Sequence, residues 1–283
     1  MQSPSSMRLS KQQRDHYDEN GFVIIENAID LAGLELIRSA YQRAERERKP
    51  EWLAMVEKGE SKGGYGNGPD AHTIRPDYSW DTTILELANN PRILPIIEEL
   101  IGPDYQVTDM LYHNHHAGSR AHTRWHRDWP PWSHPQFTLK VKCFYALDDI
   151  HEDQGCLCIV PGTHKNPEEP PKDKYDKDNL TSMPGHRKIV MNAGDVIIWN
   201  VSCWHTGLPN TSTRDRRLVI YGYMPFFVKK WSTVPPDALV KWADTPMKRQ
   251  LMGIHCVHGR RSWDRTDVEY LPDHQVIADA KKQ

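Results

Sequence analysis

The first residues of the chain show helical and short extended patterns of apolar positions. Residues 9–19 have a helical pattern that stops at Gly21, and residues 22–29 (FVIIENAI) then predict a short strand. Asp30 is suited to cap the next helix, whose apolar positions recur near helical spacing through about residue 48. The chain is therefore predicted to begin with two helices separated by one strand.

Two further patterns complete this helical part. Residues 59–71 contain five glycines, which predicts a mobile loop that could act as a lid. Residues 82–100 return to a helical pattern, interrupted at Asn90 and Pro91, where the proline can begin a second helix. The N-terminal part, about residues 9–101, is therefore predicted to be helical.

Short β-prone runs follow over about residues 105–228, separated by residues that favour turns. They are YQVTDMLYHNHH, FTLKVKCFYAL, CLCIVPG, KIVMN, GDVIIWNV and RRLVIYGYMPFF. Such strands are typical of a double-sheet jelly roll or a related sandwich. The charged, Pro-rich residues 165–188 predict a long loop, which is either a solvated connection or a cover over a site mouth. A helix is expected around DALVKWADTPMKRQLMG, in a C-terminal helical extension of about residues 233–283.

Length, charge and cysteine content narrow the class of protein. One domain spanning residues 1–283, mainly β with flanking α-helices, fits the length. The formal net charge of -2 and pI of about 6.7 provide no basic excess, so a nucleic acid partner is not expected. No apolar stretch is long enough to cross a membrane, and the start lacks a signal-peptide pattern. Five cysteines without framework spacing, including a Cys-x-Cys pair that lacks the second pair of a zinc site, favour reduced thiols in a cytoplasmic protein.

Candidate metal ligands stand close together at His126 and Asp128. Side chains alternate in an extended segment, so these two project to one side while Arg127 points away. The best candidate for a third ligand is His205, 77 residues after Asp128 in GDVIIWNVSCWHTG. Two histidines and one carboxylate leave three octahedral positions open, as in non-haem Fe(II) oxygenases. A 2-oxo acid can take two of these positions and O2 the third.

An arginine is expected to bind the far carboxylate of the 2-oxo acid, because its planar fork donates two parallel hydrogen bonds. Arg216 and Arg217 begin the β-prone run after His205, and alternation lets only one of them face the interior. A lone His-x-Asp triplet carries little weight in a chain with fifteen histidines. Here the distal histidine and the arginine follow it in the order that this chemistry needs.

Over about residues 10–230 the chain resembles the phytanoyl-CoA dioxygenase family of Fe(II)/2-oxoglutarate oxygenases. The similar stretches are NGFVIIENAID, WHRDW, ALDDIHEDQGCLCIVPGTHK and GDVIIWNVSCWHTGLPNTSTRDRRLVIYGY. The resemblance implies a double-stranded β-helix, the jelly-roll or cupin-like core, with helices on one sheet.

The resemblance also implies a set of site residues and an activity. His126, Asp128 and His205 would bind Fe(II), and Arg216, eleven residues past the distal histidine, would bind 2-oxoglutarate, with Arg217 facing outward. The enzyme would use O2 to oxidise, most simply by hydroxylation, a small organic metabolite, with release of succinate and CO2. Natural-product biosynthesis is one setting. No glycine loop argues for a CoA thioester, so a small free metabolite is favoured.

Some residues near the motifs need a separate interpretation. His164 lies in the PGTHK stretch, which resembles a structural turn of the family, so an architectural role is expected. Trp204 departs from the family's smaller residue before the histidine and is expected to reshape the pocket wall. Some of the aromatic residues around the ligand segments are expected to line an apolar pocket, and most to form core. These are Trp125, Trp129, Trp132, Tyr145, Trp199, Trp204, Tyr221 and Tyr223.

Two other functions stay open at this point. His113 and His115 would share one strand face and could form a cupin-type metal site with Glu152 and His205, although surface or supporting histidines are the commoner outcome. A non-catalytic metabolite-binding module on the same barrel would be expected to lose a ligand or the arginine. A halogenase would replace the carboxylate that Asp128 supplies. A small-molecule substrate is the expected partner, a membrane is not, and a homodimer is possible.

Overall fold

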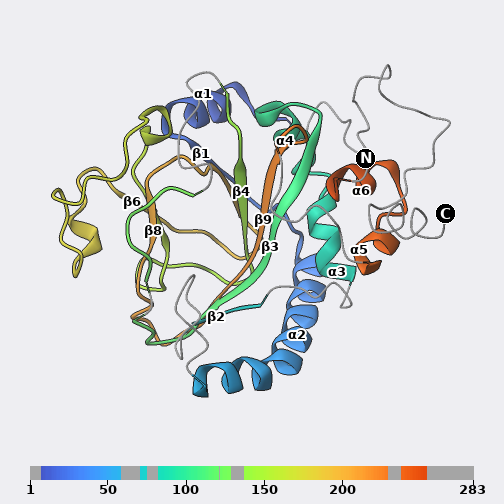
Figure 1. Ribbon diagram of the computed structural model, residues 1–283, viewed down its shortest axis with the longest axis horizontal. Coiled ribbons are helices and arrows are strands. Elements are labelled where there is room, and N and C mark those ends of the chain that lie inside the picture. The colour runs from blue at the N-terminus through green and yellow to red at the C-terminus, as the bar shows by residue number, and fades with distance from the viewer. Residues whose placement is uncertain are drawn as a thin grey trace, which may run out of the picture.

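Two antiparallel sheets form the centre of the protein, with most helices on the outer side of the larger sheet (Figure 1). The computed structural model describes residues 8–58, 71–74, 82–120, 122–128, 137–228 and 237–253. The strands are β1 (Phe22–Ile25), β2 (Ala71–Ile74), β3 (Tyr105–His115), β4 (Val141–Ala146), β5 (Leu157–Ile159), β6 (Arg187–Ile189), β7 (Val196–Asn200), β8 (His205–Gly207) and β9 (Arg216–Pro225). The larger sheet has the order β1-β7-β4-β9-β3-β2 and the smaller one β6-β5-β8. The predicted jelly-roll, cupin-like fold class is confirmed.

The first helix, α1 (Lys11–Asn20), has the predicted C-terminal cap at Gly21 and an N-terminal cap at Ser10 that was not predicted. The Ser10 hydroxyl accepts from the backbone N–H of Gln13, whose side chain in turn accepts from the Ser10 N–H, which satisfies two free donors of the first turn. Gly21 ends the helix at φ 83° and turns the chain directly into β1. The helix starts two residues later than the pattern predicted, because Ser10 is its cap.

The second helix, α2 (Leu31–Glu57), is capped by Asp30 as predicted but is longer than expected. The pattern placed its end near residue 48, whereas the helix continues through Pro50 to Glu57. Proline removes one helical hydrogen bond, and the strong helix formers around it, among them Leu53 and Ala54, allow the helix to continue.

The predicted break near Pro91 separates two short helical pieces. The helix α3 (Thr82–Leu85) runs into the 3₁₀ helix η2 (Glu86–Asn89), and α4 (Leu94–Ile101) follows after a turn. Pro91 lies in that turn rather than in the first turn of α4, because the Asn90 side chain already accepts from the Arg92 N–H. Near the C-terminal end of the described residues lie two helices, α5 (Asp237–Trp242) and α6 (Pro246–Leu251).

The strands differ from the sequence pattern in three places, one of them at His205, which was expected at the end of the β-prone run GDVIIWNVSCWHTG. β1 ends at Ile25, because residues 26–29 form a turn with Asn27 at φ 51°. β2 was not predicted and pairs with β3. His205 does not end the strand that precedes it: β7 stops at Asn200, and His205 begins β8 on the opposite sheet.

Both faces of the larger sheet are buried. Outward side chains of β4 and β9 form one core with the helices, where the hydroxyls of Tyr145, Tyr221 and Tyr223 donate to helix-region carbonyls. Inward side chains such as Trp199 and Ile220 join the smaller sheet in a second core. The second core forms the inside of the barrel, and the candidate ligands lie there.

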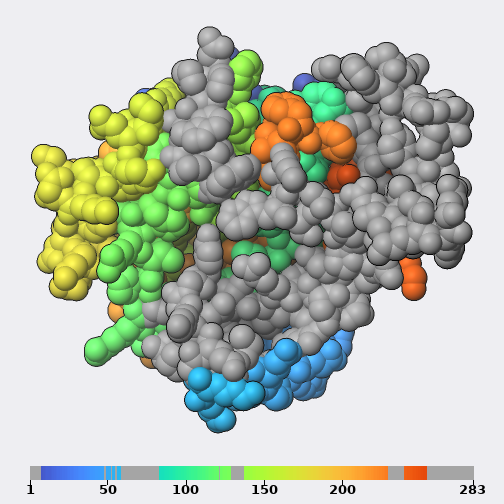
Figure 2. All heavy atoms as spheres, viewed as in Figure 1, coloured from blue at the N-terminus to red at the C-terminus, as the bar shows by residue number. Residues whose placement is uncertain are grey.

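The predicted long loop 165–188 is confirmed apart from its ends, which belong to the 3₁₀ helix η3 (Thr163–Lys165) and to β6. It contains one 3₁₀ turn, η4 (Leu180–Ser182), and protrudes beside the smaller sheet, in yellow at the left of Figure 2. The glycine-rich residues 59–70 lie outside the described residues, so their role as a lid stays a prediction.

The predictions about the cysteines, membrane crossing and domain organisation have different outcomes. The four described cysteines, Cys143, Cys156, Cys158 and Cys203, are buried free thiols, as expected, and Cys256 lies outside the described residues. In the described part of the chain no helix is long and apolar enough to cross a membrane. The organisation as one domain over residues 1–283 stays a prediction.

Candidate metal centre

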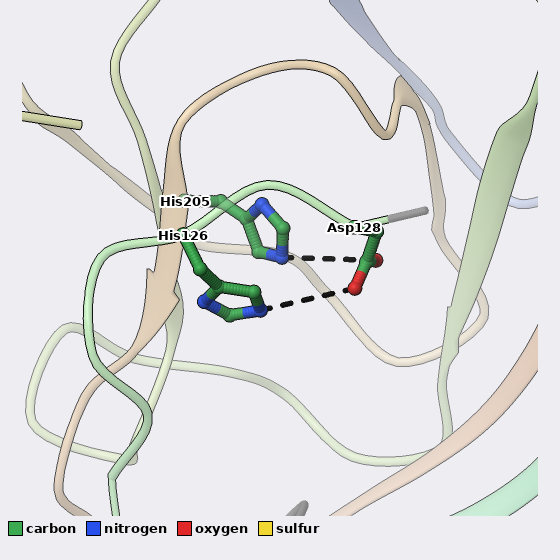
Figure 3. A group of neighbouring side chains, drawn as sticks. All are labelled: His126, Asp128 and His205. Carbon is green, nitrogen blue, oxygen red and sulfur yellow. Dashed lines mark ion pairs between the residues drawn. The ribbon is translucent and has the colours of Figure 1, made fainter. Parts of the chain in front are cut away.

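Backbone hydrogen bonds place the two histidines of the site side by side. The His126 N–H donates to the His205 carbonyl at 3.0 Å and the His205 N–H donates back at 2.9 Å. Residues paired in this way point to the same face, and the two imidazole centroids lie 4.1 Å apart. The Asp128 N–H donates to the Val201 carbonyl at 3.1 Å, which carries the carboxylate to the same side. The predicted ligands therefore come together, as Figure 3 shows.

Each imidazole is fixed in the tautomer that a metal needs. Nδ1 of His126 lies 2.6 Å from the Arg124 carbonyl, and Nδ1 of His205 lies 3.0 Å from the Cys203 carbonyl. A carbonyl only accepts, so Nδ1–H must be the donor in both contacts. In the neutral rings the lone pair is then on Nε2, the atom that faces Asp128 in each case.

The Asp128 carboxylate lies between the two rings and is held by a lysine. Its Oδ1 is 3.8 Å from His126 Nε2, its Oδ2 is 3.7 Å from His205 Nε2, and Lys142 Nζ is 2.6 Å from Oδ2. Burial would raise the pKa of the Asp128 carboxyl, but Lys142 and the imidazoles outweigh it and hold that pKa below its usual range. Burial, with the adjacent His126, lowers the pKa of His205 to about 3. Asp128 is thus an anion and His205 a neutral ligand near neutral pH.

This donor set fits a divalent cation. The two Nε2 lone pairs and the carboxylate all face one another as acceptors, at distances too long for hydrogen bonds. The three ligand atoms lie within 4.8 Å of one another, and no other such group occurs among the described residues. A cation at their centre would satisfy all three, and the set of two imidazoles and one carboxylate suits ferrous iron.

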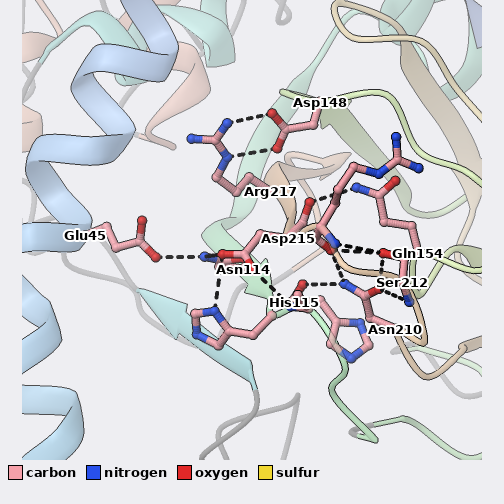
Figure 4. Close-up of polar contacts among 12 residues, drawn as sticks. Glu45, Asn114, His115, Asp148, Gln154, Asn210, Ser212, Asp215 and Arg217 are labelled. Carbon is pink, nitrogen blue, oxygen red and sulfur yellow. Dashed lines mark hydrogen bonds and ion pairs between the residues drawn. The ribbon is translucent and has the colours of Figure 1, made fainter.

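A polar network fixes the chain on both sides of Arg216 (Figure 4). The Asp215 carboxylate accepts from the Ala117 N–H at 2.9 Å and from Asn114 Nδ2 at 3.1 Å, and the Gln154 side chain donates to the Asp215 carbonyl at 2.7 Å. On the other side, Arg217 forms a two-pronged ion pair with Asp148 at 2.8 and 2.6 Å. Arg216 is therefore held as the first residue of β9.

Arg216 faces inward and Arg217 outward, as predicted. The Arg216 side chain is buried, and it donates through Nη1 to the Gly155 carbonyl. Its Nε is also buried, and among the described residues no hydrogen-bond partner for this donor is found. Burial lowers the pKa of Arg216 to about 10, which leaves it charged at neutral pH. A buried cation with an unused donor fits a carboxylate ligand.

Residues beside the ligands brace the site rather than line it. Arg127, between His126 and Asp128, points away as predicted and donates to the carbonyls of Asn166 and Glu168 in the long loop. The expectation that Trp204 reshapes the pocket wall is wrong, because its indole N–H donates to the Glu168 carbonyl at 2.8 Å. The loop is thus tied to the back of both ligand segments, which favours a supporting role over a solvated connection.

Most of the aromatic residues named from the sequence are core, as expected. Trp125 donates its indole N–H to the Leu180 carbonyl, and the three tyrosines belong to the core beneath the helices. Trp199 differs, because its ring centroid lies 4.3 Å from that of His205 and its indole N–H has no partner among the described residues. Trp129 and Trp132 lie outside the described residues.

The cupin-type alternative is not assembled in the described part of the chain. His113 and His115 lie near each other on β3, with ring centroids 6.1 Å apart, but no third ligand joins them. Glu152 is largely exposed and pairs with Lys188 at 3.0 Å. His164, expected to be architectural, lies next to Gly21 outside the ligand group.

One residue of the site was missed by the sequence analysis. Lys142 contacts Asp128, whereas Trp199, which contacts His205, was already among the aromatic residues named near the ligands. The only signal for Lys142 was its alternation with Lys140 in the run FTLKVKCFYAL, which ordinarily indicates a solvent-facing side of a strand.

Comparison with known sequences shows one consistent relationship. The model of the phytanoyl-CoA dioxygenase (PhyH) family matches residues 17–218. The peroxisomal phytanoyl-CoA dioxygenase of Bos taurus is 26% identical over 231 residues, which cover 75% of this chain and 67% of the bovine protein. The human protein of the same name is 28% identical over 167 residues, 57% of this chain and 49% of its own length.

Solved structures with a similar fold include HygX from Streptomyces hygroscopicus with nickel, 2-oxoglutarate and hygromycin B bound. It has a TM-score of 0.61 and 16% identity, and covers 79% of this chain and 90% of its own. The α-ketoglutarate-dependent epimerase SnoN from nogalamycin biosynthesis has a TM-score of 0.56 and 20% identity, covering 79% of this chain and 82% of its own. At these identities the likeness concerns the fold.

Proposed function

Because the chain belongs to the phytanoyl-CoA dioxygenase family, we propose that it oxidises a small organic metabolite with Fe(II), 2-oxoglutarate and O2. His126, Asp128 and His205 would hold the iron, and Arg216 the far carboxylate of 2-oxoglutarate. The observation that carries the proposal is the meeting of two Nε2 lone pairs and one carboxylate around a common point.

The residues of the chain have separate tasks in this reaction. The iron, when bound, supplies the sites at which the 2-oxo acid and O2 meet. The carbonyls of Arg124 and Cys203 hold Nδ1 of both rings, so that in the neutral imidazoles the Nε2 lone pairs face the metal side. Arg216 pairs with the far carboxylate and thereby orients the 2-oxo end toward the ligands.

We propose hydroxylation as the outcome. The balance is one substrate C–H, one 2-oxoglutarate and one O2 giving one C–OH, one succinate and one CO2, with one oxygen atom in the alcohol and the other in succinate. The ligand set alone does not select hydroxylation among such outcomes, since a structural neighbour of the same fold is an epimerase. The choice depends on which substrate atom the pocket presents.

A small free metabolite, in natural-product biosynthesis for example, is the proposed substrate class. Two proteins of similar fold support this choice. HygX binds hygromycin B in its crystal structure, and SnoN comes from nogalamycin biosynthesis. Location in the cytoplasm and a homodimer stay predictions.

The test is 2-oxoglutarate turnover by the purified full chain. With Fe(II) and O2, the wild-type protein is expected to form succinate, slowly without substrate, and Asp128→Ala and His205→Ala are expected to abolish it. His113→Ala and Glu152→Ala serve as matched controls, because the cupin-type alternative needs both of those residues. Succinate formation that survives loss of Asp128 but stops in the two controls would reject the proposed ligands. A substrate is then recognised by a product that gains one oxygen atom from isotopically labelled O2.

A further inference from the structure

A buried row of opposite charges runs from the metal ligand Asp128 along the inside of the barrel. Lys142 Nζ lies 2.6 Å from Asp128 Oδ2, and Lys140 Nζ lies 2.6 Å from Asp109 Oδ2. Lys142 lies on β4, directly opposite Trp199 on one side and Gly222 on the other, and Lys140 comes just before the first residue of that strand. The lysine side chains retain 8% and 9% of their exposure and that of Asp128 5%, so solvent screens the Lys142–Asp128 contact weakly.

The Lys142 contact restricts how Asp128 can bind a metal. An ammonium at 2.6 Å is a charge-assisted hydrogen bond and occupies a lone pair of Oδ2. Binding through both carboxylate oxygens would compete with this contact. Lys142 therefore favours one-oxygen coordination by Asp128, which keeps a position open for the co-substrate.

Lys142 also changes the charge that each incoming ligand meets. With Lys142 present, the pair with Asp128 is neutral, so a divalent metal meets no net negative charge there. 2-Oxoglutarate, with its far carboxylate at Arg216, meets the positive charges of the metal and of Lys142. Without the lysine charge, the metal would enter at a lone carboxylate and the dianion would lose one of the positive charges that it faces. Asp109 pairs with Lys140, and against the effect of burial both lysines hold its pKa below the usual range.

We propose that Lys142 is a positioning residue that shifts the two affinities of the site in opposite directions. It weakens the binding of metal alone and strengthens the binding of the dianion to the metal-loaded site. The inference rests on the proposed function, because it needs a metal at Asp128. A charge that acts on each ligand separately changes both affinities without changing the coupling between them, so each affinity has to be measured by itself.

The experiment measures both affinities without turnover. Mn(II) replaces Fe(II) in the absence of O2, and its dissociation constant for the full chain is determined by electron paramagnetic resonance. The dissociation constant of 2-oxoglutarate for the Mn(II)-loaded chain is then determined by calorimetry. Lys142→Met removes the charge at similar volume, and Lys140→Met is the matched control, two residues earlier in the chain and paired with a carboxylate that is not a ligand.

The inference predicts that in Lys142→Met the dissociation constant of Mn(II) alone falls about tenfold or more and that of 2-oxoglutarate for the loaded chain rises about tenfold, as expected for loss of a unit charge a few ångströms from the metal. Lys140→Met should change both constants clearly less, because its ammonium contacts Asp109 and not a ligand. Wild-type constants in Lys142→Met, or equal changes in both variants, would overturn the inference.

A second variant decides the matter if Lys142→Met does not fold, as judged by circular dichroism. Lys142→Gln keeps a hydrogen-bond donor near Asp128 without the charge. Tighter Mn(II) binding together with weaker 2-oxoglutarate binding in this variant supports the inference, while wild-type constants overturn it. Failure of the proposed function looks different. In that case the wild-type protein itself would bind no Mn(II), or 2-oxoglutarate would not bind to the Mn(II)-loaded chain.

Discussion

Replacement of Arg216 by methionine should weaken 2-oxoglutarate binding far more than it disturbs the fold. The guanidinium is buried, one of its nitrogens is engaged with the Gly155 carbonyl, and its Nε has no partner among the described residues. A carboxylate bound there would accept about two charge-assisted hydrogen bonds, each contributing about 1.5–3 kcal/mol. Allowing for the cost of removing the anion from water, we expect a net loss of about 3 kcal/mol, or roughly a 150-fold higher dissociation constant.

The assay is anaerobic titration calorimetry of the Mn(II)-loaded protein with 2-oxoglutarate and with 2-oxobutyrate, which lacks the far carboxylate. The wild-type protein should prefer 2-oxoglutarate by about the same two orders of magnitude, and Arg216→Met should lose that preference. Arg217→Met is the control, because Arg217 faces outward and pairs with Asp148. Its binding constants should stay within about twofold of wild type.

Retention of the preference for 2-oxoglutarate in a folded Arg216→Met protein would refute this reasoning. The far carboxylate would then bind elsewhere, and the unused donor of Arg216 would have another purpose. A loss of affinity for both acids alike would also contradict it, since only one of them carries the group that Arg216 is expected to bind.

Three further predictions concern stability and the long loop. Gly21→Ala should lower the free energy of unfolding, measured in urea, by about 2–4 kcal/mol, because φ is 83° and a methyl group would collide with neighbouring side chains. The control Gly118→Ala, at φ 70° with open space around it, should lose only about 1–2 kcal/mol. Equal losses in the two variants would exclude the collision. Burial lowers the pKa of His164 to about 4, so the unfolded chain takes up a proton more readily than the folded one. The unfolding free energy should therefore decline as pH falls from about 6.5 to 4, and His164→Gln should make this decline smaller by about 1 kcal/mol, after allowance for partial exposure of the ring; an unchanged decline in this variant would contradict the prediction. Arg127→Met removes donors to two loop carbonyls and should accelerate amide hydrogen exchange in residues 165–170, measured by mass spectrometry; exchange at the wild-type rate would show that other contacts hold the loop.

The ligands could be predicted from the sequence because their geometry follows from strand periodicity. Alternation places His126 and Asp128 on one face of an extended segment, and the structure keeps them there with His205 opposite. The same rule separated Arg216 from Arg217. The family resemblance read from the motifs is confirmed by the match over residues 17–218.

The remaining parts depend on tertiary contacts that a local pattern does not contain. Lys140 and Lys142 alternate with apolar residues as a solvent face would, yet both are buried, and Lys142 contacts the metal ligand Asp128. Trp204 was placed at the pocket wall, and only the course of the long loop shows that it binds Glu168 instead. The strand β2 pairs with the edge of β3, which its four residues did not reveal.

The most direct test of the account uses the visible spectrum of the protein with Fe(II) and 2-oxoglutarate in the absence of O2. A 2-oxo acid bound through two oxygens to ferrous iron gives a charge-transfer band, which the wild-type protein is predicted to show and which should be absent from Asp128→Ala and His205→Ala. A band of wild-type strength in either variant, or none in the wild-type protein, would contradict the claim that these side chains hold iron with three positions open.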